Sequence, residues 1–275
     1  MGKTLPKKLR VKWDALIETE GKKLGLENCR PFLENKMVND IFYTGTFKSR
    51  PCIVKCSSKA PDSIRNEYEI THKLHTLAPS VFPEPFSYYI SADRQYAFLV
   101  SEKLNPIPKG KFPCGAGEDL LTMVSTLSDT GIVHRDIFID NFMLGDNGHL
   151  KLIDFQFSID RNNYCECRWM CKNWKYRYVI MGIHTGMPVG VWNDVTLMLK
   201  IARDFLSSEE FSKIHASLKA YENELEFAPR ISAIDRLRLL LYKASLLVQK
   251  TFLPCGNKKE AVKRRISRLN YGVGK

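Results

Sequence analysis

The sequence lacks a long hydrophobic run, and this absence limits where the protein can reside. No stretch in the 275 residues approaches the roughly eighteen apolar residues of a transmembrane helix, so we expect no membrane span. The basic N-terminus has no apolar segment of the kind found in secretory signals. Pro6 stands where an N-myristoylated chain carries Ser or Thr. These absences predict a cytoplasmic protein.

The sequence also lacks the paired cysteines of a disulfide scaffold. Its 8 cysteines are scattered along a chain that is large enough to fold without covalent crosslinks, which favours free thiols in a reducing compartment. Cys165, Cys167 and Cys171 form a C-x-C-x-x-x-C cluster, and a zinc site there would need a fourth ligand, with His184 the nearest candidate. Because this spacing is not a common zinc pattern, we favour free thiols there too.

Basic residues outnumber acidic ones by 42 to 30, which gives a net charge of +12. This excess favours an anionic partner such as a nucleotide, a phospholipid, a phosphorylated glycan or a nucleic acid. Basic residues gather near the N-terminus and in the tail 258–275, where they would either dock on anionic lipid head groups or be solvated. The length fits one two-lobed domain or two small ones, and an apolar content of 44% suffices for a core.

The most informative stretch of the sequence is residues 132–157. It contains His-Arg-Asp at 134–136 and Asn141 five residues after Asp136. Two short apolar runs then flank Gly-Asp-Asn-Gly at 145–148, a pattern that predicts a β-hairpin. The hairpin would bring Asn141, before its first strand, close to Asp154, after its second strand. Asp136 lies on the loop that leads into this hairpin.

Three such polar side chains suit phosphoryl transfer. Carboxylate and amide oxygens are good ligands for Mg²⁺, so Asp154 and Asn141 would hold the metal that accompanies a triphosphate. Asp136 would orient an acceptor hydroxyl and take its proton. H-R-D-x-x-x-x-N followed by D-F matches the catalytic loop and metal-binding aspartate of kinases. The chain therefore resembles the protein-kinase-like superfamily.

This resemblance implies an α+β fold of two lobes, with ATP and Mg²⁺ as cofactors. Residues 1–103 would form a small antiparallel β lobe with a leading basic helix, and residues 104–275 a mainly helical lobe. Lys55 would contact the α- and β-phosphates, with Glu67 rather than Glu69 as its partner. On the residues alone, a solvated lysine at a strand end and a solvated glutamate on a helix would be favoured, so both roles depend on the resemblance.

The resemblance also implies supporting roles for residues outside the catalytic set. The segment with Glu102 and Leu104 would be the hinge that binds adenine, the alternative being a buried strand end. His134 and Arg135 would support the catalytic loop. Asp194 would hold that loop in place, unless it is simply an acidic residue at a helix N-terminus.

The sequence departs from regulated protein kinases in several features. No G-x-G-x-x-G turn lies between the first two expected strands, where residues 36–40 contain no glycine and Gly45 comes later. Gln156 replaces the glycine that permits a backbone flip after Asp-Phe, which favours a fixed metal site over a switched one. An Ala-Pro-Glu motif is also absent.

These departures, with the stretch HRDxFxxNFML…LKLIDF, make the chain similar to bacterial lipopolysaccharide core kinases, which phosphorylate heptose or related sugars. That similarity implies an anionic glycolipid or phosphorylated sugar as acceptor, and peripheral contact with the inner face of the cytoplasmic membrane. Basic and aromatic residues alternate in 158–191, which suits a sugar phosphate, packing, or less favourably single-stranded nucleic acid. One alternative is a protein or other small-molecule kinase; another is a pseudokinase that only binds, supported by the glycine-poor loop.

Hydrophobic periodicity predicts the remaining elements. We expect a leading helix that ends at Gly25. The last helix should be core rather than membrane. The first expected strand begins at 32–33, and the other expected strands are 41–43, 52–55, 88–90 and 96–100. The expected helices are 64–77, 118–129, one that begins at 191, 208–225 and 231–253.

Overall fold

The computed structural model describes residues 7–32, 41–58, 61–108, 111–162, 192–227 and 233–252. Its N-terminal elements are α1 (Lys7–Leu16), a π-helical turn (Ile17–Gly21), α2 (Lys22–Leu24), β1 (Leu26–Pro31), β2 (Ile41–Phe47), β3 (Arg50–Ser57), α3 (Pro61–Leu77), β4 (Pro85–Ile90) and β5 (Ala97–Glu102).

The second half of the chain is mainly helical. Its elements are β6 (Asn105–Pro106), α4 (Ala116–Thr130), β7 (Ile132–Val133), a 3-10 turn (Ile139–Asn141), β8 (Phe142–Leu144), β9 (Leu150–Leu152), a second 3-10 turn (Phe155–Phe157), β10 (Ile159–Asp160), β11 (Trp192–Asn193), α7 (Asp194–Phe205), α8 (Ser208–Ala220), β12 (Glu226–Phe227) and α9 (Ala233–Phe252).

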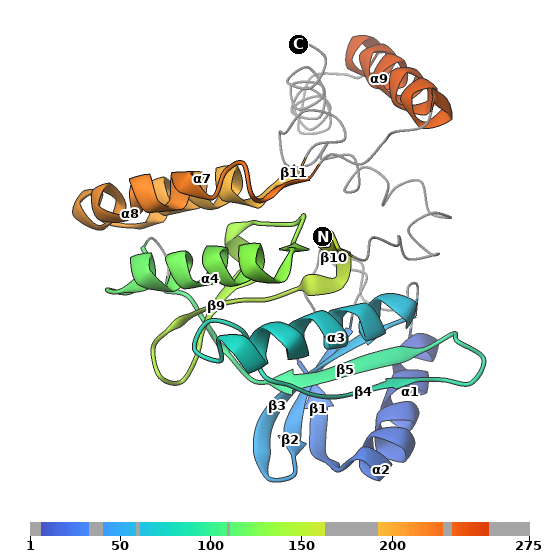
Figure 1. Cartoon of the computed structure of the whole chain (residues 1–275). Helices are drawn as coiled ribbons and strands as arrows, with labels where there is room; N and C mark the ends of the chain where they lie inside the picture. The colour runs from blue at the N-terminus through green and yellow to red at the C-terminus, as the bar shows by residue number, and fades with distance from the viewer. Residues whose placement is uncertain are drawn as a thin grey trace.

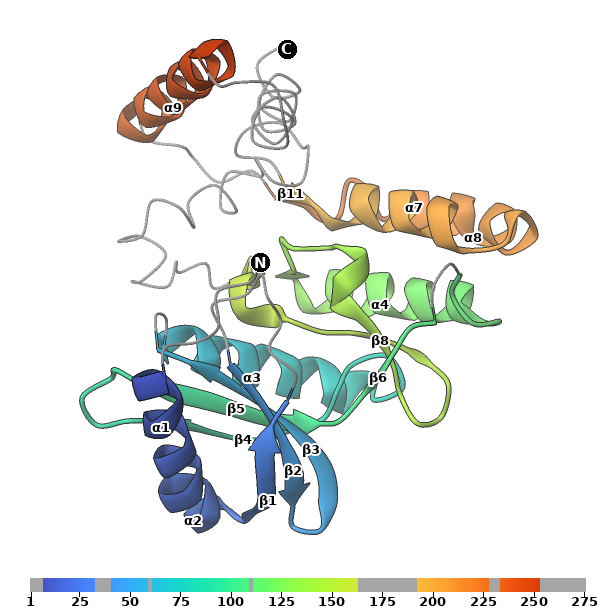
Figure 2. The same ribbon diagram turned by 180° about the vertical axis from the view of Figure 1, so that it is seen from behind.

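The first lobe is an antiparallel sheet covered by a helix on each face (Figures 1 and 2). Its strand order is β1-β2-β3-β5-β4, so α3 connects two strands that are separated by β5. Trp13 and Ile17 pack on one face against Tyr43, Val54 and other buried residues of the sheet. Ile64 of α3 packs on the other face. This lobe and the helices that follow confirm the predicted two-lobed α+β class.

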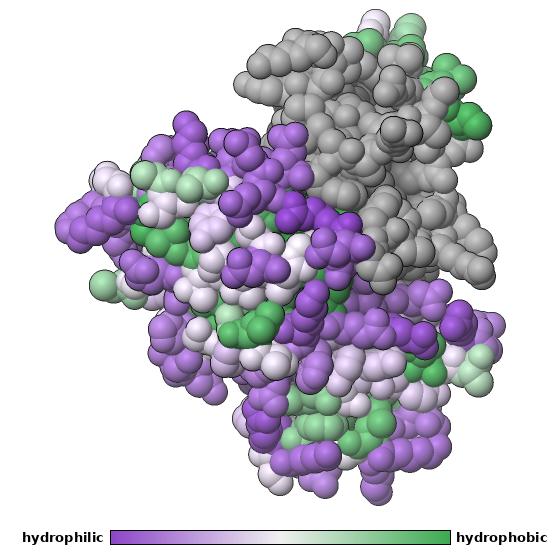
Figure 3. All heavy atoms as spheres, viewed as in Figure 1, coloured by the Kyte–Doolittle hydropathy of each residue, from purple (hydrophilic) through white to green (hydrophobic). Residues whose placement is uncertain are grey.

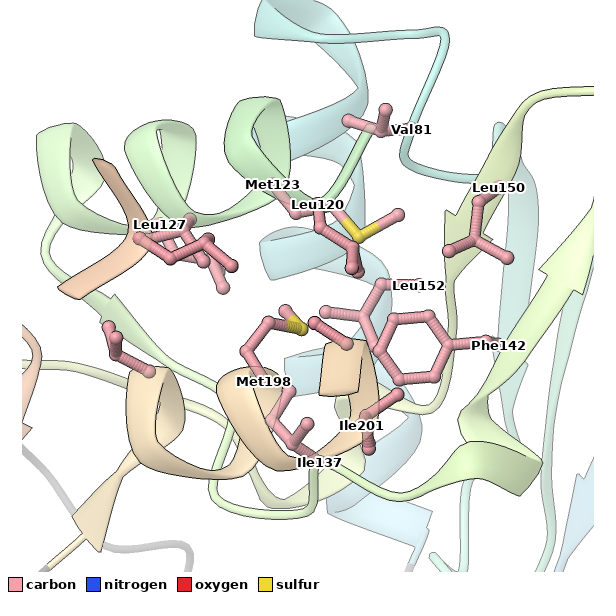
Figure 4. Packing of buried hydrophobic residues seen from close by; sticks show 14 of the residues in the cluster. Val81, Leu120, Met123, Leu127, Ile137, Phe142, Leu150, Leu152, Met198 and Ile201 are labelled. Atoms are coloured by element: carbon pink, nitrogen blue, oxygen red, sulfur yellow. The ribbon is translucent and has the colours of Figure 1, made fainter. Parts of the chain in front are cut away.

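In the described residues, α4, α7, α8 and the hairpin β8–β9 build the core of the second lobe, and Ile70 and Leu74 of α3 pack into the same cluster. In Figure 4, Leu120, Met123 and Leu127 of α4 point toward Met198 and Ile201 of α7. Apolar side chains of the hairpin close the same cluster from a second side. The core therefore anchors the hairpin on which the predicted site residues lie. The proposed lobe boundary at 103/104 falls just after β5 and remains a prediction.

The prediction that the first strand opens at Phe32 was wrong, and Leu33, the other residue of that prediction, lies outside the described residues. The strand is β1, which ends at Pro31, and Phe32 follows it as an exposed residue. Gly25 ends α2 in a left-handed conformation (φ 96°) and donates its N–H to Lys22 O, so the chain enters the strand at once. Gly45 of β2 lies so close to β1 that a Cβ there would stand 2.7 Å from Glu27 O.

Two predictions for the C-terminal helices also need correction. α8 ends at Ala220 rather than near residue 225, because turns lead from there into β12. The last helix is not core along its whole length. Apolar side chains of α9 are exposed: Ile234, Leu237, Leu241, Leu247, Val248 and Phe252. Figure 3 shows hydrophobic surface at the upper right, where α9 lies in Figure 1. No helix in the described ranges is long and apolar enough to cross a bilayer.

Candidate active site

The hairpin predicted from the sequence is present. Phe142 pairs with Leu152, and Leu144 with Leu150. Asn141 immediately precedes β8, and its backbone carbonyl accepts a hydrogen bond from Ile153 N at 2.9 Å. This bond closes the open end of the hairpin and fixes Asn141 beside the residue that precedes Asp154.

Lys55 connects the two lobes at this end of the hairpin. Its Nζ lies 2.9 Å from Glu67 Oε2 and 2.6 Å from Asp154 Oδ1. Lys55 comes from β3, and Glu67 from the buried face of α3. Glu69, two residues along the helix, is exposed. The structure thus places Glu67, rather than Glu69, against the lysine.

Asp136 is held by hydrogen bonds at both ends of its backbone. Its N–H donates to His134 Nδ1 (3.2 Å), and Asn141 Nδ2 donates to its carbonyl (2.8 Å) and more weakly to Oδ2 (3.4 Å). Burial, followed by the negative charge of Asp154, raises the pKa of Asp136 to about 7. A carboxyl group that titrates near neutral pH is suited to act as a general base.

Asp194 directly contacts the loop that carries Asp136. Its two carboxylate oxygens accept hydrogen bonds from His134 N (2.5 Å) and Arg135 N (3.1 Å). Asn193, not Asp194, caps α7 by accepting from Thr196 N. The contacts of Asp194 are therefore made to the loop and not to the end of its own helix. Burial raises the pKa of Asp194 to about 6.

His134 and Arg135 brace the loop from inside. Burial lowers the pKa of His134 to about 4, so the ring is neutral at physiological pH, and its Nε2 lies 3.0 Å from Ile153 O. The fully buried Arg135 adopts a left-handed backbone (φ 67°) and donates Nε to Phe157 O at 2.6 Å. Together these bonds tie the loop to the chain on both sides of Asp154.

The segment after Asp154 contacts α3 and β7. Asp154 itself is left-handed (φ 70°), and Gln156 lies in the 3-10 turn that follows. Asn66 of α3 donates to Ser158 O at 3.0 Å, and Ile159 pairs with Val133. The idea that the site is fixed rather than switched remains a prediction.

The predicted hinge has its side chains turned to the protein. The carboxylate of Glu102 pairs with Lys151 and accepts the N–H of Glu84 at 3.0 Å. Leu104 is buried, and its backbone N–H and C=O form no hydrogen bond within the described ranges. The Glu102 side chain is therefore engaged by protein groups, and the role of this segment in binding adenine remains a prediction. The sequence analysis did not predict a role for Lys151. Its position between two apolar strand residues could have indicated one, because a charged residue there must be buried with a partner.

The oxygens at the hairpin end fit a hard divalent cation. Asn141 uses Nδ2 toward Asp136, which leaves Oδ1 without a hydrogen bond in the described part of the chain. Asp154 uses Oδ1 toward Lys55, and its Oδ2 likewise has no partner there. One amide and one carboxylate oxygen at the end of a rigid hairpin suit Mg²⁺, which keeps several waters.

Several predictions fall outside the described residues. They are the glycine-poor segment 36–40, the Cys165/Cys167/Cys171 cluster with His184, most of the basic and aromatic segment 158–191, and the tail 258–275. In the described ranges, Cys29, Cys52, Cys56 and Cys114 form no disulfide. Within the same ranges no group of three or more His, Cys, Asp or Glu residues could hold a metal.

Comparison with known proteins shows similarity to protein kinases. No family model matches the chain. Over 130 residues it is 30% identical to the dual specificity protein kinase zak2 of Dictyostelium discoideum, a match that covers 45% of this chain and 19% of that protein. Over 123 residues it is 27% identical to the serine/threonine-protein kinase kin-29 of Caenorhabditis elegans. That match covers 43% of this chain and 15% of kin-29.

A third match is to the serine/threonine-protein kinase cek1 of Schizosaccharomyces pombe, 37% identical over 82 residues, or 26% of this chain and 6% of the relative. The chain thus spans less than a fifth of each of these three proteins. The similarities support a place in the protein-kinase-like superfamily. They give no support to the narrower resemblance to lipopolysaccharide core kinases.

Proposed function

We propose that this chain transfers the γ-phosphate of ATP to a hydroxyl group of an acceptor. The observation that carries the proposal is the position of Lys55 Nζ between Glu67 and Asp154, at 2.9 and 2.6 Å. Lys55 and Asp154 are 99 residues apart in the chain, so their contact requires that both lobes be folded and closed together. A merely structural lysine at a strand end has no need of two carboxylates.

In the proposed reaction, the acceptor oxygen forms a bond to the γ-phosphorus while the bond to the β–γ bridging oxygen breaks. Asp136 takes the proton of the acceptor hydroxyl, which its pKa near 7 allows. Lys55 places a positive charge beside the phosphates. Asp154 and Asn141 would hold Mg²⁺, and the bound ion would neutralise part of the negative charge of the triphosphate. Positioning and fixed charge provide most of the catalysis.

The acceptor can be a protein or a sugar, and each alternative rests on a different observation. The three relatives are serine/threonine or dual specificity protein kinases, which favours a protein hydroxyl. The net charge of +12 favours an anionic acceptor such as a phosphorylated sugar or a glycolipid. The protein-kinase alternative now has the stronger support, since the similarity to known proteins points that way.

The test is ATP turnover with Mg²⁺ by the wild-type chain, Asp136→Asn and the matched control Asp140→Asn. Asp140 is an exposed carboxylate on the same loop. We expect Asp136→Asn to lower turnover by about 10²-fold or more, as for loss of a general base, and Asp140→Asn to leave it unchanged. Parallel assays with protein substrates and with extracted lipopolysaccharide identify the acceptor.

Each outcome of this test has a distinct meaning. Turnover that is equal in all three proteins would refute the role of Asp136. Nucleotide binding without turnover, or no nucleotide binding at all, would favour the pseudokinase alternative.

A further inference from the structure

Lys151 is a charged residue inside a buried strand. Its side chain is only 6% exposed, and its two neighbours in β9 are core leucines. Nζ is bound by the Glu102 carboxylate and by Phe82 O, the latter at 3.3 Å. The stem passes over Gly145, where an added Cβ would stand 3.0 Å from Lys151 Cε. The fold therefore makes room for this lysine and supplies it with two acceptors.

The contact with Glu102 belongs to a network that reaches across the first lobe. Glu102 and Glu84 exchange hydrogen bonds, with Glu102 N donating to Glu84 O at 2.9 Å and Glu84 N donating to the Glu102 carboxylate at 3.0 Å. The Glu84 carboxylate then binds Arg50, at the start of β3, through two bonds of 2.8 and 2.5 Å. The residue at the end of β5 is thus fixed from both lobes.

The hairpin that carries Lys151 also holds the chain beyond the hinge. β6 pairs with β8, and Asn105 donates to Asp146 in the hairpin turn at 3.0 Å. The hinge segment between β5 and β6 is therefore attached to one hairpin on each side. The opposite end of this hairpin carries Asn141 and Asp154. A displacement of the hinge relative to these two residues would have to break the Lys151 contact or the β6–β8 pairing.

We propose that Lys151 is a positioning residue for the nucleotide, which sets the distance between the hinge and the metal-binding end of the hairpin. This inference rests on the proposed function. A buried ion pair is weak evidence of stabilisation, because desolvation of both charges offsets their attraction; its contribution is to hold one geometry. An apolar side chain of similar length could fill the same space without holding Glu102.

The experiment compares Lys151→Met with Lys151→Arg, Glu102→Gln and the control Lys219→Met, an exposed lysine of α8. Binding of a non-hydrolysable ATP analogue with Mg²⁺ is measured by calorimetry, KM and kcat for ATP by turnover, and melting temperature by circular dichroism. We expect Lys151→Met to raise both Kd and KM about tenfold with kcat changed less than about twofold, since a misplaced hinge weakens nucleotide binding. Lys151→Arg should recover most of the affinity. The effects of Lys151→Met and Glu102→Gln should be less than additive when combined.

The outcomes separate this inference from the proposed function. If Lys151→Met melts at a lower temperature but keeps the wild-type Kd and KM, Lys151 is structural and the inference is overturned. If the wild-type chain binds the analogue without turnover, the proposed function fails, whereas the Kd values still decide the role of Lys151. If the wild-type chain binds no nucleotide, both fail.

Discussion

Asp136 is expected to destabilise the fold at the pH where it is catalytically competent. Burial raises its pKa to about 7 from the ordinary 3.8. Because the folded-state pKa is the higher one, the contribution of Asp136 to stability is present below about pH 4 and is lost as the pH rises through 7. At 1.36 kcal/mol per pKa unit, the ionised carboxylate costs the fold about 4 kcal/mol at pH 8.

Asp136→Asn removes this cost while it keeps the shape of the side chain. We expect its free energy of unfolding to exceed that of the wild type by up to about 4 kcal/mol at pH 8, and the two proteins to converge toward pH 4. Urea unfolding measures the free energy of unfolding of both proteins at each pH. A chelator is added because a bound divalent cation would favour the ionised form of Asp136. His134 acts in the opposite sense, since its pKa is lowered to about 4 and its contribution is lost as the pH falls below 6.5. Because His134 is present in both proteins, its contribution cancels in the difference between their free energies of unfolding.

Activity should follow the opposite pH dependence. A general base must be ionised, so kcat/KM should rise about tenfold per pH unit up to an inflection near pH 7 and then level off. Asp140→Asn should show the same profile as the wild type. An inflection below pH 5, or an Asp136→Asn protein no more stable than the wild type at pH 8, would contradict the reasoning.

Three further substitutions test other parts of the site and the fold. Glu67→Gln should lower kcat/KM roughly tenfold or more by weakening the hold on Lys55, whereas Glu69→Gln, an exposed glutamate of the same helix, should leave steady-state kinetics unchanged. Asp194→Asn replaces one acceptor oxygen with a donor that faces a backbone N–H, so turnover should fall about tenfold or more while far-ultraviolet circular dichroism is retained. Gly45→Ala should lower the free energy of unfolding by about 1–3 kcal/mol in urea titrations, since the new Cβ would stand 2.7 Å from Glu27 O, a backbone atom. Thr46→Ala is the control. Equal stability of the two variants would argue against the close approach of Gly45 to β1.

The parts of the site that could be predicted from the sequence are those set by local spacing. A two-strand hairpin with a Gly-Asp-Asn-Gly turn fixes the approach of Asn141 to the residues before Asp154, because nothing outside residues 141–154 is needed to close it. The choice of Glu67 over Glu69 rested on the resemblance to kinases, and it agrees with the helical period, which puts the two residues on different faces of α3. In both cases the distance along the chain determines the distance in space.

The first strand could not be located in the same way, for a physical reason. β1 is an edge strand whose residues alternate poorly and include Glu27, Asn28 and Arg30, with Asn28 in a left-handed conformation at a bulge. Charged residues and bulges are common devices that protect sheet edges, and they remove the apolar alternation that identifies a strand. The partners of Lys151 were equally hidden, since Glu102 lies 49 residues earlier and is brought near only by packing of the lobes.

The site therefore depends on two kinds of contact that differ in how easily they are lost. The relation of Asn141 to Asp154 is local and is buttressed by the core beneath the hairpin, so it persists as long as the second lobe is folded. The relation of Lys55 to Asp154 spans 99 residues and exists only while the lobes are closed. Opening of the lobes would thus separate Lys55 from Asp154 but leave Asn141 and Asp154, the two side chains proposed to bind metal, together. The proposed catalytic geometry is therefore sensitive to the arrangement of the lobes. That arrangement is held by polar contacts, such as those of Glu102 with Lys151 and of Asn66 with Ser158, and by the packing of Ile70 and Leu74 of α3 into the core of the second lobe.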